Sequence, residues 1–205
     1  MSHYFVNDDK VASKPRNVVY SFNGVDFSLE SDNGVFSKNE LDKGSELLIE
    51  MLLPIDLGNK LLDLGCGLGV IGLTLAYFHP GLNVCLSDVN TRALSLCNAN
   101  AATLMLSQRV TVLQSDIYLE IEGKFDSIVS NPPIRAGKKV TYEIYKGAVN
   151  HLVDGGSLYI VIRKQQGALS VKAYLEELFG NVTVLARDKG YYILKATKVS
   201  MKGAI

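Results

Sequence analysis

The chain has 205 residues, which is long enough for one sizeable α/β domain. Its 21 basic and 21 acidic residues balance, so no global basic field draws it onto nucleic acid, and any RNA binding needs a local patch or recognition of a base. Three cysteines without Cys-x-x-Cys spacing and three scattered histidines argue against a disulfide framework and against a metal site.

Residues 1–5 show no secretory signal, and no apolar run reaches the ~18 residues needed to span a bilayer. We therefore expect a protein that does not enter a membrane. Because the cysteines argue against a disulfide framework, a reducing cytoplasm fits best.

The N-terminal part predicts a β-hairpin followed by a helix. Two strand-like runs, residues 17–22 and 25–30, flank Asn23-Gly24, which is the strongest short signal for a hairpin. A loop over residues 31–39 leads into an amphipathic helix over about residues 42–53, which Pro54 ends.

From residue 60 onward, strands alternate with helices. We predict strands at 60–64, 83–87, 110–114, 125–130 and 157–163, helices at 70–78, 91–106, 141–153 and 169–179, and a closing pair of strands at 182–186 and 191–196. This order implies an α/β fold: a doubly wound, mostly parallel, seven-stranded Rossmann-like sheet with a C-terminal antiparallel hairpin, in addition to the short N-terminal β-hairpin.

A glycine-rich turn, Asp63-Leu64-Gly65-Cys66-Gly67-Leu68-Gly69, joins the first strand of this series to a helix. Such a turn lets the backbone approach a ligand at the carboxyl edge of the sheet. The run from Gly67 to Gly72 also satisfies the dinucleotide pattern Gly-x-Gly-x-x-Gly, and Asp88 follows where a ribose-binding acid belongs. The turn alone leaves a nicotinamide-dependent oxidoreductase open.

Asp63 favours a different cofactor. At the end of its strand its carboxylate would face the ligand, where it would repel a pyrophosphate and attract the ammonium and sulfonium of S-adenosylmethionine. Asp88 could accept from the ribose hydroxyls of either cofactor. Asp116 could accept from the adenine amino group and Ile117 could cover the ring, although Asp116 could also be a helix cap or a loop carboxylate.

Asn131-Pro132-Pro133 follows the strand at 125–130. The Asn side-chain amide both donates and accepts, and the two prolines lack a backbone N–H, so loop carbonyls are more easily left free. These groups suit a planar –NH2 group. The Asn131 side-chain oxygen and the Pro132 carbonyl would accept the two hydrogens of this group. They would thereby direct the nitrogen lone pair at the methyl group of S-adenosylmethionine and stabilise the positive charge that develops on the nitrogen.

Together these residues resemble the class I S-adenosylmethionine-dependent methyltransferases, with residues 62–67 as the first motif and Asn131-Pro132-Pro133 as the motif of the amino-methylating branch. A narrower resemblance, to the ribosomal RNA guanine-N2 methyltransferases of the small-domain type, extends from about residue 34 to residue 196. It is carried by Gly34-Val35-Phe36-Ser37, Leu41-Asp42-Lys43-Gly44-Ser45, Leu47-Leu48, Gly147-Ala148-Val149, His151-Leu152 and Gly155-Gly156.

The resemblance implies S-adenosyl-L-methionine as cofactor, rRNA processing by rRNA methylation, and a division into an N-terminal extension with hairpin (1–33) and a methyltransferase domain (34–205) that form one unit. The implied catalytic residues are Asn131, Pro132 and Pro133. The implied cofactor-binding residues are Asp63, Gly65, Cys66, Gly67, Gly69, Asp88, Val89, Asp116, Ile117 and Asn131. The expected partner is RNA, from ribosomal RNA or a ribosomal subunit, bound by a monomer or weak dimer without a metal.

Two departures from the family concern the substrate. The additional N-terminal domain of the larger members is missing, and Ile134-Arg135 stands where an aromatic residue commonly follows Asn-Pro-Pro. We expect Phe36, Lys38, Ile134 and Arg135 to contact substrate, with Lys138 and Lys139 at either a phosphate contact or a solvated helix start. Methylation of a protein glutamine amide and a non-catalytic cofactor-binding module remain alternatives.

Overall fold

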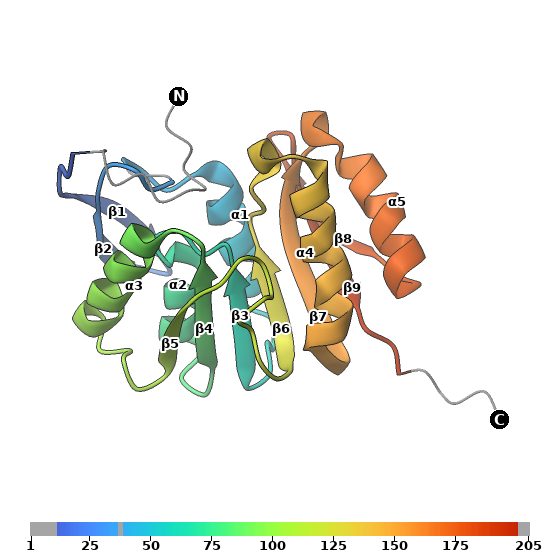
Figure 1. Ribbon diagram of the computed structural model, residues 1–205, viewed down its shortest axis with the longest axis horizontal. Helices are drawn as coiled ribbons and strands as arrows, with labels where there is room; N and C mark the ends of the chain where they lie inside the picture. Colours follow the sequence, from blue (N-terminus) through green and yellow to red (C-terminus); the bar gives the residue numbers. More distant parts are fainter. Residues whose placement is uncertain (1–11, 37–38, 201–205) are drawn as a thin grey trace.

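The computed structural model describes residues 12–36 and 39–200 and contains a central seven-stranded sheet (Figure 1). The strands lie in the order β5-β4-β3-β6-β7-β9-β8. Their bounds are β3 Lys60–Leu64, β4 Asn83–Asp88, β5 Val110–Gln114, β6 Phe125–Ser130, β7 Leu152–Arg163, β8 Thr183–Asp188 and β9 Tyr191–Thr197. The strands from β5 to β7 are parallel, and β9 runs antiparallel to both β7 and β8. The predicted fold class is confirmed.

Helices cover both faces of this sheet. The α-helices are α1 Lys43–Leu52, α2 Val70–Phe78, α3 Thr91–Thr103, α4 Lys138–His151 and α5 Ala168–Phe179, and two short 3-10 turns are η1 Ile134–Ala136 and η2 Lys164–Gln166. Because side chains alternate along a strand, Leu61 packs into one core with α1, α2 and α3, whereas Leu62 packs into a second core with α4 and α5. In Figure 1, α4 and α5 lie in front of the sheet and α1 and α2 lie behind it.

The predicted boundary between α4 and β7 is wrong by several residues. Helix α4 ends at His151 instead of residue 153, and β7 starts at Leu152 instead of residue 157. The helix also starts earlier, at Lys138 instead of residue 141. Leu152 is fully buried and pairs with Phe125, so the chain passes from helix to strand without a loop. Gly155 then adopts a φ of 83°, which absorbs the irregularity before regular pairing resumes.

Helix α3 also ends earlier than predicted, at Thr103 and not at residue 106. Met105 adopts a φ of 57°, a left-handed conformation that the helix cannot continue through, while Leu106 turns back into the core. Apolar periodicity extends past the helix end because the next apolar side chain is still buried.

The N-terminal hairpin, β1 Arg16–Phe22 and β2 Val25–Ser31, packs on α2 and α3. The Tyr20 ring stacks on Phe27 at 5.1 Å, and its hydroxyl lies 2.9 Å from Thr74 Oγ1 in α2. Asn100 in α3 accepts from the Glu30 backbone N–H at 2.7 Å and donates to the Glu30 carbonyl at 3.1 Å. The hairpin therefore shares the core of the main sheet.

Within residues 12–36 and 39–200, no helix is long and apolar enough to cross a membrane. The same part of the chain holds no group of three or more His, Cys, Asp or Glu side chains that could bind a metal ion.

Candidate active site at the carboxyl edge of the sheet

Loops that follow β3, β4, β5 and β6 meet at one edge of the sheet, because these strands are parallel neighbours. Ser130, the last residue of β6, donates from Oγ to the Leu64 carbonyl at 2.7 Å. The residue before Asn131 is thus tied directly to the residue before Gly65. The glycine turn and the Asn-Pro-Pro loop therefore lie side by side.

The glycine turn presents bare backbone at this edge. Gly65 and Gly67 adopt φ values of 74° and 54°, and a Cβ added at either would meet no atom of the described residues within 4 Å. Gly69 is different, because a Cβ there would lie 3.0 Å from Leu73 and 3.2 Å from Cys97. Gly65 and Gly67 thus border open space that a ligand can fill, whereas Gly69 permits close packing of α2.

Cys66 contributes backbone, not its thiol, to this turn. Its side chain is buried, and its Sγ lies 3.9 Å from Cys97 Sγ, which itself donates to the Gly67 carbonyl at 3.1 Å. Burial and the neighbouring Cys97 thiol raise the pKa of Cys66, so the thiol stays protonated.

Asp63 lies beneath the turn, on the face that α2 covers, and only 1% of it is exposed. Its Oδ2 accepts from the Gly72 N–H at 2.8 Å, while its Oδ1 is buried and has no hydrogen-bond partner among the described residues. Desolvation, together with the nearby Asp88 carboxylate, raises its pKa to about 7. A buried acceptor without a partner is costly, which makes it suited to a cationic ligand group.

Asp88 ends β4 with both carboxylate oxygens engaged by backbone N–H groups. Oδ2 accepts from Gly67 and Oδ1 from Asn90, each at 2.9 Å. Burial raises the pKa of Asp88, and the hydrogen bonds from Asn90, Gly67 and Val89 oppose that rise. Each oxygen has a second lone pair, so acceptor capacity remains for hydroxyl donors. Val89 beside it is half-buried.

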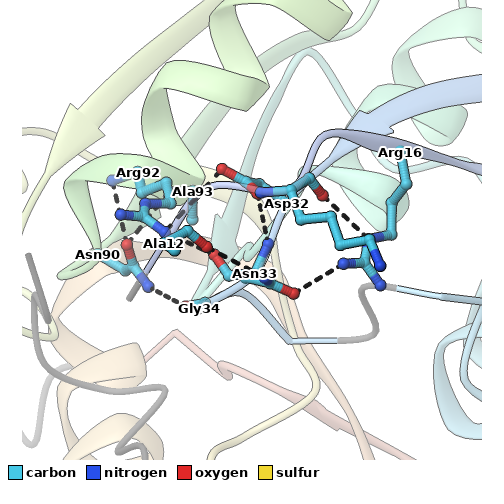
Figure 2. Close-up of polar contacts among 9 residues, drawn as sticks. Ala12, Arg16, Asp32, Asn33, Gly34, Asn90, Arg92 and Ala93 are labelled. Carbon is cyan, nitrogen blue, oxygen red and sulfur yellow. Dashed lines mark hydrogen bonds and ion pairs between the residues drawn. The ribbon is translucent and has the colours of Figure 1, made fainter. Parts of the chain in front are cut away.

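Asn90 connects this acid to the segment that precedes α1. Its Oδ1 caps α3 by accepting from the N–H groups of Arg92 and Ala93, and its Nδ2 donates to the Gly34 carbonyl at 2.9 Å. Figure 2 shows the same contact beside the bond from Arg92 to the Asn33 carbonyl, at 2.9 Å. Residues 33 and 34 are therefore held against the loop that follows β4.

Arg16 and Asp32 hold the other side of that segment. The Arg16 guanidinium donates to Asn33 Oδ1 at 2.7 Å, and Asp32 Oδ1 accepts from the Asn33 N–H at the same distance (Figure 2). Arg92 adds an ion pair to Asp32 at 3.9 Å. The hairpin thereby fixes residues 33 and 34, which lead toward Phe36, a residue that is 51% exposed. Lys38 lies outside the described residues.

Asp116 and Ile117 lie in a turn after β5, and no helix starts there. Asp116 is exposed, whereas Ile117 adopts a φ of 54°, which is strained for a β-branched residue. Ser115 stabilises this shape by donating to the Ile117 carbonyl at 3.0 Å, and its own N–H binds the Asp88 carbonyl at 3.1 Å. The turn is thus held beside Asp88.

Tyr118 anchors the far end of this turn on α4. Its hydroxyl donates to the Ile144 carbonyl at 3.0 Å, and its ring stacks on His151 at 4.3 Å. A Cβ on Gly147 would come within 2.4 Å of the Tyr118 ring, so only glycine leaves room for it. His151 Nδ1 lies 2.9 Å from the Gly147 carbonyl, which gives this histidine a structural role.

Asn131 is half-buried and its amide nitrogen faces the start of α1. Nδ2 lies 3.2 and 3.3 Å from the two carboxylate oxygens of Asp42 and 3.1 Å from Ser45 Oγ. The Pro132 carbonyl accepts from the Ile134 N–H at 2.8 Å, so it is not free, although one lone pair remains. The Pro133 carbonyl likewise accepts from Ala136 at 2.9 Å.

Beyond this loop, Ile134 is half-buried in η1 and Arg135 is exposed. Lys138 and Lys139 are exposed at the start of α4. None of these three basic side chains forms an ion pair with another described residue.

Sequence reasoning missed three residues of this region. Asp42 and Ser45 were part of a matching segment but were assigned no role, and Asn90 was not noticed at all. A helix N-cap is readable at Asp42 and Asn90, but contacts across 89 and 56 residues of chain are not.

The wound sheet, the glycine turn flanked by Asp63 and Asp88, and the Asn-Pro-Pro loop beside it define a class I S-adenosylmethionine-dependent methyltransferase. The family model for the methyltransferase small domain matches residues 26–195, so the chain belongs to this family. The resemblance inferred from the motifs is confirmed.

Curated relatives differ in how much is known of them. The uncharacterized protein YbxB of Bacillus subtilis is 43% identical over 199 residues, covering 96% of this chain and 98% of that protein. Ribosomal RNA small subunit methyltransferase C of Erwinia tasmaniensis is 38% identical over 169 residues, covering 80% and 48%, respectively. The Escherichia coli O1:K1 protein of that name is 35% identical over 190 residues, covering 90% and 53%. The chain spans about half the length of these two methyltransferases.

Among solved structures, the Thermus thermophilus 16S rRNA N2 G1207 methyltransferase RsmC, in complex with AdoMet and guanosine, superimposes with a TM-score of 0.80. It is 27% identical and the match covers 90% of this chain and 50% of that one. A methyltransferase from Pyrococcus furiosus, 21% identical with a TM-score of 0.65 over 75% of this chain and 81% of that one, shares the fold.

The cofactor of this family is S-adenosylmethionine, and the site fits it. Asp63 Oδ1, which has no hydrogen-bond partner within the described ranges, suits a cationic group, and the bare backbone at Gly65 and Gly67 leaves room for a ligand.

Proposed function

We propose that this protein transfers a methyl group to the exocyclic 2-amino group of a guanine in ribosomal RNA. The observation that carries the proposal is the bond from Ser130 to the Leu64 carbonyl, which holds the Asn-Pro-Pro loop next to the glycine turn. An amine that is hydrogen-bonded to Asn131 would then lie beside the cofactor. The similarity to the ribosomal RNA small subunit methyltransferase C proteins supports ribosomal RNA as the substrate, and the similarity to the 16S rRNA N2 G1207 methyltransferase supports guanine as the base. A ribosomal substrate would place the enzyme in the cytoplasm.

The cofactor supplies an electrophilic methyl group on a positively charged sulfur. The protein's part is to position and polarise the amine. Asn131 Oδ1 accepts one amine hydrogen and the remaining lone pair of the Pro132 carbonyl accepts the other. Both acceptors stabilise positive charge as the new N–C bond forms and the C–S bond breaks. Neither can take the proton that the nitrogen must lose, so this proton leaves to water.

On the cofactor side, we propose that Asp63 holds the ammonium group of the methionine moiety through its unpartnered oxygen. Asp88 accepts from the ribose hydroxyls with its remaining lone pairs. The turn at Asp116 and Ile117 covers the adenine, since the strained Ile117 backbone is fixed by Ser115 and Tyr118 next to Asp88.

On the substrate side, Arg135, Lys138 and Lys139 are exposed directly after the catalytic loop and form no ion pair within the described part of the chain, which suits contacts to RNA phosphates. Ile134 and Phe36 offer apolar surface to a base turned out of its stack.

Methyl transfer to 30S subunits, naked 16S rRNA and total protein, all from cells lacking this chain, tests the proposal. We expect radiolabel in RNA, released by nuclease digestion as N2-methylguanosine. Asn131→Ala is expected to lower turnover by about 10²-fold or more while leaving stabilisation by S-adenosylhomocysteine unchanged. Asn150→Ala, an exposed position on α4, is the matched control. Label found only in protein would overturn the RNA assignment and favour a protein amide as substrate.

A further inference from the structure

The side chain of Asp42 performs two tasks at the N-terminus of α1. Its Oδ1 caps the helix by accepting from the N–H groups of Gly44 at 3.0 Å and Ser45 at 3.3 Å. The same carboxylate lies 3.2 and 3.3 Å from Asn131 Nδ2, across 89 residues of chain. Capping alone needs one oxygen, so the contact with Asn131 is an additional function.

The chemistry of a carboxylate fixes which way the Asn131 amide faces. A carboxylate only accepts, so the –NH2 end of the amide must turn toward Asp42 and the oxygen must turn away. Ser45 Oγ, on a residue 6% exposed, lies 3.1 Å from the same nitrogen. Helix α1 therefore engages both amide hydrogens, and Asn131 has only its acceptor left to offer a substrate.

Gly44 holds α1 close enough for these contacts. A Cβ on Gly44 would lie 2.9 Å from the Tyr191 ring in β9 and 3.2 Å from Val161 in β7. Glycine thus lets the first turn of α1 lie directly on β7, which is next to β6, and on β9, which brings Asp42 and Ser45 to Asn131.

We propose that Asp42 and Ser45 are positioning residues that present the Asn131 oxygen, and not its –NH2, to the substrate. They select for a nucleophile that donates hydrogen bonds, and the Asp42 charge polarises the amide so that its oxygen becomes a stronger acceptor. This inference rests on the proposed function for its catalytic consequence. The amide orientation itself does not depend on the identity of the substrate.

Asp42→Ser separates the two tasks of Asp42, because serine still caps a helix but is too short to reach Asn131. We expect kcat to fall by about 10- to 100-fold, with KM, melting temperature and S-adenosylhomocysteine affinity nearly unchanged. Glu46→Gln, which removes a carboxylate from the same helical turn where it pairs with Lys43, is the matched control and should leave kcat as it is. An unchanged kcat in Asp42→Ser would overturn the proposal.

A double-mutant cycle tests whether Asp42 acts through Asn131. Asp42→Ser should have no further effect on kcat when Asn131 is already alanine, because the amide it orients is gone. Equal effects in both backgrounds would mean that Asp42 acts elsewhere and would overturn the proposal. The paired exchange Asp42→Asn with Asn131→Asp restores a donor–acceptor pair, and it should recover part of the activity that Asn131→Asp loses alone.

Side-chain amide signals of Asn131, identified in a 15N–1H spectrum by their loss in Asn131→Ala, test the orientation without any substrate. We expect both hydrogens to exchange slowly, and to shift in Asp42→Ser but not in Glu46→Gln. Signals that exchange like those of an exposed asparagine, and that ignore Asp42→Ser, would overturn the proposal. Absence of methyl transfer by the wild-type enzyme to any RNA would overturn only the proposed function.

Discussion

Replacing Asp63 by asparagine should make the ligand-free protein more stable at pH 8 and make its cofactor affinity worse. Asp63 is 1% exposed, and its Oδ1 has no partner among the described residues. Asparagine is isosteric, retains an oxygen that can accept from the Gly72 N–H, and carries no charge. The substitution therefore isolates the effect of the buried charge.

The magnitude follows from the pKa of Asp63, which desolvation raises from 3.8 to about 7. Because the folded protein retains this proton where the unfolded chain has lost it, stability falls as the pH rises from about 4 to about 7 and then levels off. The rise in pKa corresponds to about 4 kcal/mol of lost stability above pH 7. The amide nitrogen of asparagine is left unpaired at a cost of about 1–3 kcal/mol. The net gain for Asp63→Asn at pH 8 is about 1–3 kcal/mol, and it should vanish near pH 5.

Cofactor binding should show the opposite dependence. A cationic ligand favours the ionised form of Asp63, so binding below pH 7 must expel a proton. The affinity for S-adenosylhomocysteine should therefore fall, and its dissociation constant rise, by up to about tenfold for each pH unit below about 7. In Asp63→Asn the affinity should be weak and independent of pH.

Urea unfolding of both proteins from pH 5 to pH 8 measures the first effect. Isothermal titration calorimetry in two buffers of different ionisation enthalpy measures the second, together with the proton released. A wild-type affinity that is flat between pH 5.5 and pH 8, with no proton release, would refute the assignment of Asp63 to a cationic group. Equal stability of the two proteins at pH 8 would refute the claim that the buried charge of Asp63 destabilises the ligand-free protein.

Two further predictions concern the walls of the site. Gly147→Ala should destabilise the protein by about 1–3 kcal/mol and weaken S-adenosylhomocysteine binding, because the added methyl group would come within 2.4 Å of the Tyr118 ring. Adding Tyr118→Leu should recover part of both losses. Denaturation measures the stability and calorimetry measures the binding. Arg135→Ala with Lys139→Ala should raise the KM for RNA several-fold and flatten its salt dependence, leaving S-adenosylhomocysteine affinity unchanged; an unaltered salt slope would exclude phosphate contacts there.

Most of the fold could be predicted from the sequence because its strongest signals are local. Residues 60–64, 70–78, 110–114 and 125–130 were predicted with the bounds that the structure has. The errors at the ends of α4 and α3 and at the start of β7 share one cause. At Leu152 and Leu106 a buried apolar side chain continues the pattern of the helix after the helix itself has ended.

The candidate site was only partly predictable, because local patterns identify chemical groups but not their surroundings. The glycine turn predicted a backbone that binds a ligand, but nothing in the sequence indicated that Asp63 is buried with one oxygen that has no partner in the part of the chain that the structure describes. Prolines suggested free carbonyls at the Asn-Pro-Pro loop. In the structure the Pro132 carbonyl is already engaged by Ile134, because the chain turns immediately into η1.

The carboxylates of Asp63 and Asp42 show that contacts between residues far apart in the sequence determine what a side chain at the site can do. Asp63 accepts from the Gly72 N–H of α2, and Asp42 accepts from the Gly44 N–H of α1. These two hydrogen bonds alone would indicate a purely structural role for both carboxylates. The two carboxylates differ in what else they can bind: among residues 12–36 and 39–200, Asp63 Oδ1 has no hydrogen-bond partner, whereas Asp42 also contacts Asn131. We therefore propose that Asp63 takes a positive group of the methyl donor and that Asp42 orients the acceptor for the amine. In this fold two carboxylates, each bound to backbone N–H groups in the first turn of a helix, supply negative charge on the donor side and on the acceptor side of the site.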